Sequence, residues 1–100
     1  IVTDILAEPG GTVIVAFDYR GDIPFLVNRG YYFHVRGGRS LRLAGSLADR
    51  EIQVLLDEVE VGESSRERLF EAVDRAIALG RERVVIIRDG LTHFYAVSLR

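Results

Sequence analysis

The sequence predicts a single α+β domain, in which a mostly antiparallel sheet of about five or six strands carries two helices on one face. A chain of 100 residues fits one domain, here residues 1–100. Short β-branched and aromatic segments, separated by glycine turns, fill both ends of the chain. Apolar residues recur at helical spacing in between. These observations predict the element order ββββααββ.

Four short strands are expected in the first half of the chain. Pro24 cannot donate a backbone hydrogen bond, so we expect the second strand to lie at an edge or to begin late. Gly37-Gly38 is a two-residue hairpin signal between the third strand and the fourth. The leading residues, Ile1 to Ala7, fit either a strand or a frayed helix. The four strands are residues 12–20, 23–28, 31–36 and 39–44.

Two helices are expected next. Ser46 can cap a first helix that runs from Leu47 to about Val59. Ser64 and Glu67 have the spacing of a capping box and open a second helix, which Gly80 ends. The apolar stripe of the first helix consists of Ile52, Leu55, Leu56 and Val59.

A hairpin is expected to complete the sheet. Residues 83–88 and 91–99 form its strands, and Asp89-Gly90 forms its turn. The alternation in the last strand does not decide which of its two faces is buried.

Charge is distributed unevenly along the chain. Residues 12–45 hold five Arg and two acids, a net charge of +3, and residues 83–100 hold three Arg and one acid, a net charge of +2. Residues 46–82 hold five Arg and ten acids, a net charge of −5. The predicted strands are therefore basic and the predicted helices acidic, an asymmetry that bears on which partners the protein attracts.

The period of two along the predicted strands places polar and aromatic side chains on one sheet face. Phe33, Val35 and Leu41 should then pack under the helices. The opposite, open face should present Tyr32, His34, Arg36 and Arg42, with Arg20, Arg29 and Arg39 on the rim.

Aromatic rings and guanidinium groups on an open, basic sheet face favour single-stranded DNA or RNA. Bases stack on the rings and arginine contacts the phosphates. The leading hypothesis is thus a non-enzymatic nucleic-acid-binding module that forms a homodimer. The alternative is a homodimerisation or protein-interaction domain that uses the same face, since Tyr and Arg are also enriched at protein interfaces.

Several kinds of catalytic and cofactor site find little support. The chain has no cysteine, which excludes disulfides and thiolate chemistry. No nucleotide-binding glycine motif or nucleophile elbow occurs, so no cofactor is expected. His34 and His93 could form a metal-free acid–base couple for RNA cleavage if their strands paired. A metal site of these histidines with Asp18 has no support from spacing.

The chain shows no membrane-spanning apolar run and no signal peptide. Together with the absence of cysteine, this makes the cytoplasm the expected compartment.

Residues 30–56 resemble one stretch of the divergent AlbA-type domain found with Schlafen proteins. In that family a glycine-led strand ends in an Arg-Gly dipeptide and is followed by a turn of small residues and a helix. The residues that match this pattern are Gly30, Tyr32, Val35, Arg36 and Gly37. The resemblance covers about a quarter of the chain, and the Glu-Phe-Lys start and the asparagine–glycine–glycine segment of the family are missing. It implies association with nucleic acid and carries over no catalytic residue.

Overall fold

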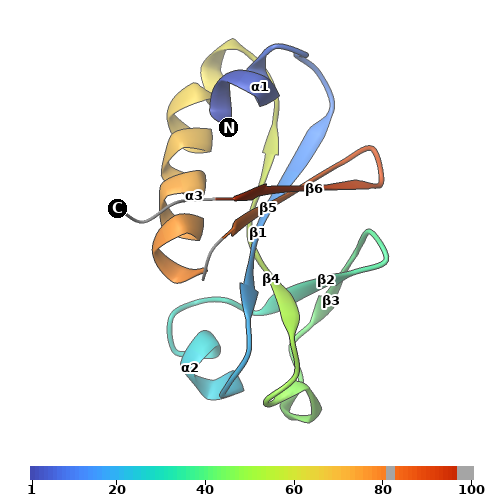
Figure 1. The fold of residues 1–100 in the computed structure, drawn as a ribbon, viewed down its shortest axis with the longest axis vertical. Helices are drawn as coiled ribbons and strands as arrows, with labels where there is room; N and C mark the ends of the chain where they lie inside the picture. Colours follow the sequence, from blue (N-terminus) through green and yellow to red (C-terminus); the bar gives the residue numbers. More distant parts are fainter. Residues whose placement is uncertain (81–82, 97–100) are drawn as a thin grey trace.

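The computed structural model describes residues 1–80 and 83–96. Six strands form one open antiparallel sheet in the order β3-β2-β4-β1-β5-β6, and three helices lie on one side of it (Figure 1). The predicted class, α+β with a mostly antiparallel sheet, is confirmed, but the order of the elements is not ββββααββ. The elements are α1 (Val2–Leu6), β1 (Thr12–Tyr19), α2 (Ile23–Val27), β2 (Phe33–Arg36), β3 (Arg39–Arg42), η1 (Gly45–Leu47), β4 (Ile52–Glu60), η2 (Glu63–Ser65), α3 (Arg66–Leu79), β5 (Arg83–Arg88) and β6 (Leu91–Ala96).

The main core lies between the helices and the central strands β4, β1 and β5. Phe17 of β1 is 1% exposed and contacts the edge of the Tyr31 ring, with ring centroids 5.5 Å apart. Leu69 of α3 and Leu26 of α2 are almost completely buried in the same cluster. The helix-facing side of the sheet therefore carries the main core.

A second, smaller cluster lies on the other side of the sheet, which we call the open face. It consists of Ala16, Val35, Val85 and Ile87, all buried, with Ile14 and Leu55 partly buried against them. No described helix covers this face. Instead, the β2–β3 and β5–β6 hairpins project on the side away from α3 (Figure 1), and their strands β2 and β5 contribute residues to the small cluster.

The segment expected as the second strand is the helix α2. Asp22 stands at its N-cap position with extended backbone, and Pro24 occupies the first turn. Proline is favoured there because the first N–H groups of a helix have no intrahelical partner. Ile23 and Leu26 are three residues apart, and both are buried. The same proline is thus a helix-start signal here, and the prediction of an edge strand was wrong.

The segment expected as the first helix is β4, which lies between β1 and β2 at the centre of the sheet. The register between β1 and β4 shifts where Ala16 pairs with Leu55 but Val15 pairs with Asp57, so that Leu56 is an extra residue. This β-bulge reverses the alternation, because one extra residue exchanges the two faces. Ile52 and Val54 precede the shift and Val59 follows it, yet all three belong to the main core. The buried apolar residues of β4 therefore recur at a spacing that resembles the apolar stripe of a helix.

Helix α3 confirms the second predicted helix, with a different start. Ser65 rather than Ser64 makes the polar contacts: its hydroxyl accepts a hydrogen bond from the N–H of Gly62 and donates one to the carbonyl of Gly62. Gly80 does end the helix. A Cβ there would lie 2.8 Å from the carbonyl oxygen of Ala76, so the position needs glycine for space rather than for a positive φ.

Both predicted hairpins are present. The two turn residues have positive φ in each case, 58° and 74° for Gly37-Gly38 and 52° and 75° for Asp89-Gly90. This is the backbone of a type I′ turn, whose twist matches that of the strands. Strand β6 is described as far as Ala96, so the end of the predicted strand 91–99 lies outside the described residues.

Residues 1–7, which fit two assignments, contain the helix α1 (Val2–Leu6). Within the described part of the chain, no helix has the length and hydropathy needed to cross a bilayer.

Candidate functional site: a cleft between two hairpins

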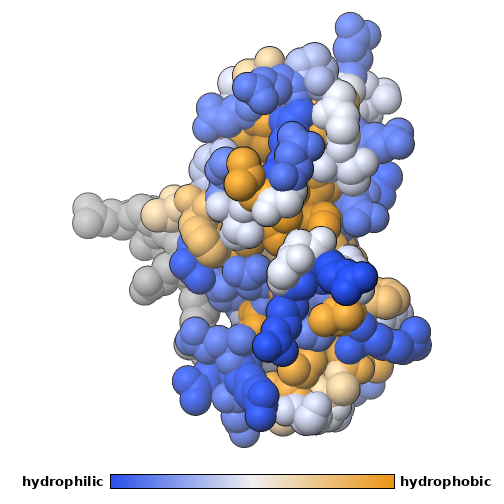
Figure 2. Space-filling view, turned by 90° about the vertical axis from the view of Figure 1, so that its right-hand side faces the viewer, coloured by the Kyte–Doolittle hydropathy of each residue, from blue (hydrophilic) through white to orange (hydrophobic). Residues whose placement is uncertain are grey.

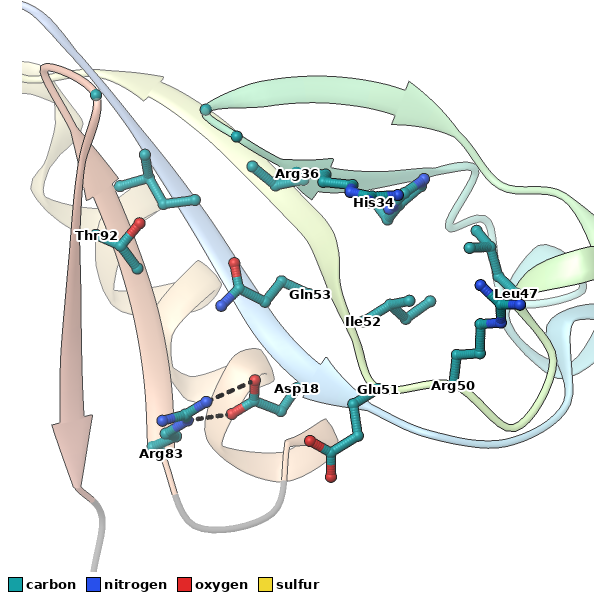
Figure 3. Close-up of a pocket in the computed structure, with 15 residues that line it drawn as sticks. Asp18, His34, Arg36, Leu47, Arg50, Glu51, Ile52, Gln53, Arg83 and Thr92 are labelled. Carbon is teal, nitrogen blue, oxygen red and sulfur yellow. Dashed lines mark hydrogen bonds and ion pairs between the residues drawn. The ribbon is translucent and has the colours of Figure 1, made fainter.

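A cleft of about 640 Å³ lies on the open face, between the two hairpins. The turn glycines of both hairpins, Gly37, Gly38 and Gly90, line it together with Thr92. Figure 3 shows the β5–β6 hairpin on one side, the β2–β3 hairpin on the other and β1 and β4 between them. Figure 2 views this side of the molecule and shows hydrophilic and apolar residues interspersed across it. A cleft of this volume is in the range of ligand-binding sites.

The floor of the cleft is a polar row that crosses the central strands. Asp18 of β1 pairs in register with Gln53 of β4, and Gln53 pairs with Val35 of β2. Residues directly opposite in an antiparallel pair point to the same face, so all three lie on the open face. The floor therefore offers a carboxylate and an amide beside apolar surface.

Arg83 forms the wall on the β5 side. Its guanidinium makes an ion pair with Asp18, and its Nη2 donates to the Oδ1 of Asp18 at 3.3 Å. The guanidinium carbon also lies 4.0 Å from the centroid of the Phe94 ring. The hydrogen bond to Asp18 raises the pKa of Arg83, and the nearby charge of Glu51 acts in the same direction. Arg83 is thus held firmly by its neighbours.

The β2–β3 hairpin forms the opposite wall and carries arginine without acids. Residues 33–42 include Arg36, Arg39 and Arg42 and no Asp or Glu. Arg36 and Arg39 are directly opposite each other next to the turn. The ion pairs found within residues 1–80 and 83–96 are Arg68–Asp57 and Arg83–Asp18, so no described carboxylate pairs with these three guanidinium groups.

Arg50 adds a further cation at the end of the cleft, where the chain enters β4. It lines the cleft beside Arg36 and Glu51. Figure 3 places Arg50 and Arg36 on the opposite side of the cleft from Arg83. Cations therefore stand on both walls, with two carboxylates, Asp18 and Glu51, between them.

The open face predicted to carry Tyr32, His34, Arg36 and Arg42 is not formed as expected. The side chains of β2 point to the faces opposite to those predicted. His34 pairs with Val54, a residue of the main core, and is only 6% exposed. Val35 instead faces the open side. Phe33 pairs with Arg42, so Arg42 lies on the face opposite to His34. Arg36 follows His34 by two residues, so Arg36 and its partner Arg39 are on the side of His34 and not on the side of Val35. Burial lowers the pKa of His34, and the positive charge of Arg36 lowers it further.

Aromatic rings are nevertheless exposed on both hairpins. Tyr32 is 48% exposed just before β2, and Phe33 is 37% exposed within it. The Arg42 guanidinium lies 5.9 Å from the Phe33 ring centroid. Phe94, on β6, is 49% exposed and pairs with Val85 of the open face. Each hairpin therefore presents a phenylalanine with an arginine beside it.

The two predicted rim arginines near α2 hold local structure. The Nε of Arg20 donates to the carbonyl oxygen of Asp49 at 2.9 Å. Arg29 donates to the carbonyl of Phe25 at 3.2 Å, and its guanidinium lies 3.6 Å above the ring of that residue. These contacts fix the turns around α2, and neither residue lines the cleft.

The two histidines are far apart in the sheet. His34 is on β2 and His93 on β6, and β4, β1 and β5 lie between them. The strands do not pair, so the acid–base couple proposed for RNA cleavage is not formed. In the described part of the chain, no three His, Asp or Glu side chains are grouped as a metal site would need.

The predicted charge separation between strands and helices holds only in part. Asp57, Glu58 and Glu60 belong to the central strand β4 rather than to a helix. Glu58 pairs with Ile14 and Glu60 with Thr12, toward the end of β1 remote from Asp18. The concentrated positive charge is therefore a property of the β2–β3 hairpin and not of the whole sheet.

Sequence reasoning did not find several cleft residues. Gln53 and Glu51 were hidden because residues 47–59 fit a helical pattern. Arg83 is the first residue of the predicted strand 83–88. Its place at the end of a predicted strand was the signal that could have marked Arg83 as a candidate site residue.

No protein-family model matches the chain, and none of the curated proteins matches it in sequence.

Proposed function

We propose that the protein binds single-stranded DNA or RNA along the β2–β3 hairpin and in the cleft beside it. One observation carries this proposal: a projecting hairpin bears Arg36, Arg39 and Arg42 without a single acid, and no described carboxylate neutralises them. This arrangement supports an anionic partner, and the exposed rings next to the arginines favour nucleic acid over a simple anion.

The tip of the hairpin supplies the electrostatic argument. Arg36 and Arg39 are directly opposite in the ladder. Like charges in this position destabilise a strand pair by about 0.2–1 kcal/mol. A phosphate between the two guanidinium groups removes this repulsion and accepts charge-assisted hydrogen bonds from both. Folding alone gains nothing from the pair, whereas binding of a polyanion does.

The exposed rings supply the argument for single strands. Tyr32 lies just before β2 and Phe33 within it, on the strand that carries Arg36, and Phe94 lies on the β5–β6 hairpin. A base can stack on such a ring only when it is not paired in a duplex, and each stack contributes about 1–3 kcal/mol. Arg42 beside Phe33 can contact the phosphate that belongs to a stacked base.

The main test is fluorescence anisotropy of a labelled mixed-sequence oligonucleotide over a range of salt concentrations. We expect binding that weakens steeply with salt. For R36A/R39A the slope of log Kd against log salt should fall by about 1.4, since each phosphate contact on a single strand contributes about 0.7. The matched control is R66A/R75A, which removes two exposed arginines of α3, outside the β2–β3 hairpin. It should leave the slope unchanged.

A second arm tests stacking with a matched ring. F33A should weaken binding about tenfold, because the lost stack is worth more than 1 kcal/mol. F70A is the control, since Phe70 on α3 is 44% exposed and has Arg66 5.5 Å from its centroid. Absence of binding at low salt, or equal losses in the hairpin variants and the α3 variants, would contradict the proposal.

A further inference from the structure

Strand β6 is an unprotected edge of the sheet. It is the last strand in the order, and within the described residues nothing pairs with its outer side. Residues 91–96 contain no Asp, Glu, Lys, Arg or Pro. Such residues are the usual means by which natural proteins keep an edge strand from pairing with another chain. A free edge of this composition is a template for a further strand.

The other edge of the sheet is different. Strand β3 is only four residues long and carries Arg39 and Arg42. Two copies of β3 brought side by side would oppose four guanidinium groups, so this edge disfavours self-association. The sheet thus has one protected edge and one unprotected edge.

Side chains of β6 are exposed on both sides of the sheet. Leu91 is 63% exposed and shares its side with His93 and Tyr95, since His93 pairs with Ile86 of the main core. Phe94 is 49% exposed on the open face. A partner that covers both Leu91 and Phe94 must itself have two faces, as a β-strand does.

The geometry points to a second copy of this chain as the partner, with the two β6 strands paired antiparallel about a twofold axis at His93. In this register Leu91 is opposite Tyr95 of the second copy, and Phe94 is opposite its Thr92. Each exposed apolar side chain then gains a partner on its own face, which is the unit of sheet stabilisation. An isologous pair also closes, whereas β3-to-β6 pairing would propagate into a filament.

The twofold axis is perpendicular to the sheet, so the paired sheets form one continuous sheet. The helices of both copies lie on the same side, and both clefts open on the other side. This arrangement is independent of what the cleft binds.

The first test is the mass in solution, measured by light scattering on a size-exclusion column across a range of concentrations. We expect a mass of two chains for residues 1–100. L91K/F94K should reduce the mass twofold, because lysine at an edge strand opposes pairing. L41K is the matched control on the other edge, where Leu41 is 42% exposed, and should leave the mass unchanged. Circular dichroism confirms that each variant is folded.

The second test uses the absence of cysteine in the chain. H93C places two thiols directly opposite each other at the axis, where the Cα separation of about 4.5–5.5 Å is compatible with a disulfide. Mild oxidation should yield a covalent dimer for H93C and not for L41C. A single-chain mass at every concentration overturns the proposal. So does a mass that grows beyond two chains, or a dimer that L41K disrupts and L91K/F94K does not.

Discussion

The two hairpins have the same backbone design and use arginine in opposite ways. Each has a type I′ turn, each projects from the open face, and each provides a wall of the cleft. In the β5–β6 hairpin the described arginines are bound: Arg83 pairs with Asp18, and Arg88 donates to three backbone carbonyls. In the β2–β3 hairpin no described acid faces the arginines.

The difference shows that residue type alone does not separate an arginine that holds the fold together from one without a described structural contact. Arg88 satisfies the carbonyls of Ile5, Glu8 and Gly10, so it ties α1 and the loop after it to the sheet. Among the residues that the structure describes, Arg36 and Arg39 make no such contact, and they stand directly opposite each other. The arginines of the β5–β6 hairpin therefore contribute to stability, whereas the opposed charges of Arg36 and Arg39 in the β2–β3 hairpin should reduce it slightly.

The largest change in stability is expected from Arg88→Ala. It leaves three backbone carbonyls without their charged donor, which should lower the free energy of unfolding by about 3 kcal/mol. Urea denaturation measures this loss. Arg88→Lys is the control, because lysine keeps the charge but cannot reach all three acceptors. Its free energy of unfolding should lie between those of the wild type and of Arg88→Ala. An unchanged urea midpoint in Arg88→Ala would contradict the structural role of Arg88.

A smaller change in the free energy of unfolding is expected from Arg83→Ala, and little or no loss is expected from Arg36→Ala. Arg83→Ala removes an exposed ion pair and the contact with the Phe94 ring, which together contribute about 1 kcal/mol. Arg36→Ala removes a repulsion, so the unfolding free energy should stay the same or rise by a few tenths of a kcal/mol. Equal destabilisation by the two variants, measured in parallel by thermal unfolding, would show that the two walls do not differ as described.

The smallest effect concerns the pH dependence of stability. The pKa of His34 is lowered in the folded state by burial, so the unfolded chain takes up a proton at higher pH than the folded one. Stability is therefore complete above the ordinary pKa of histidine, near 6.5, and falls as the pH decreases toward the folded-state value. His34→Gln should flatten this decline between about pH 6.5 and the folded-state pKa. His93→Gln on the exposed β6 strand is the control for loss of an imidazole, and a decline unchanged in His34→Gln would assign it to other groups.

Local signals were sufficient for the parts of the fold where sequence and structure share one period. The two glycine-containing turns predicted both hairpins, and the apolar stripe of residues 66–79 predicted α3. They were insufficient at β4, where the extra residue Leu56 makes a strand imitate a helix. At α2, Pro24 has one meaning at a strand edge and another in a first helical turn, and only the tertiary packing of Ile23 and Leu26 decides between them.

The candidate site was predictable to a similar extent. Arg36 and Arg39 follow from the hairpin alone. His34 was placed on the wrong face, because the orientation of β2 depends on its pairing with β4, a strand the sequence pattern concealed. Arg50, Glu51 and Gln53 reach the cleft through the same concealed strand. One misassigned central element therefore accounts for most of the missing site residues.

The extra residue at Leu56 constrains how the chain can vary in length. Loops usually tolerate insertions and deletions. A deletion at Leu56 would instead move every side chain on one half of β4 to the opposite face of the sheet. Removing Leu56 would aim the carboxylates of residues 58 and 60 at α3, or else the amide of residue 53 into the main core. A homologous chain with this fold must therefore keep the extra residue of the bulge. Otherwise its apolar positions in one half of β4 must be displaced by one residue along the sequence.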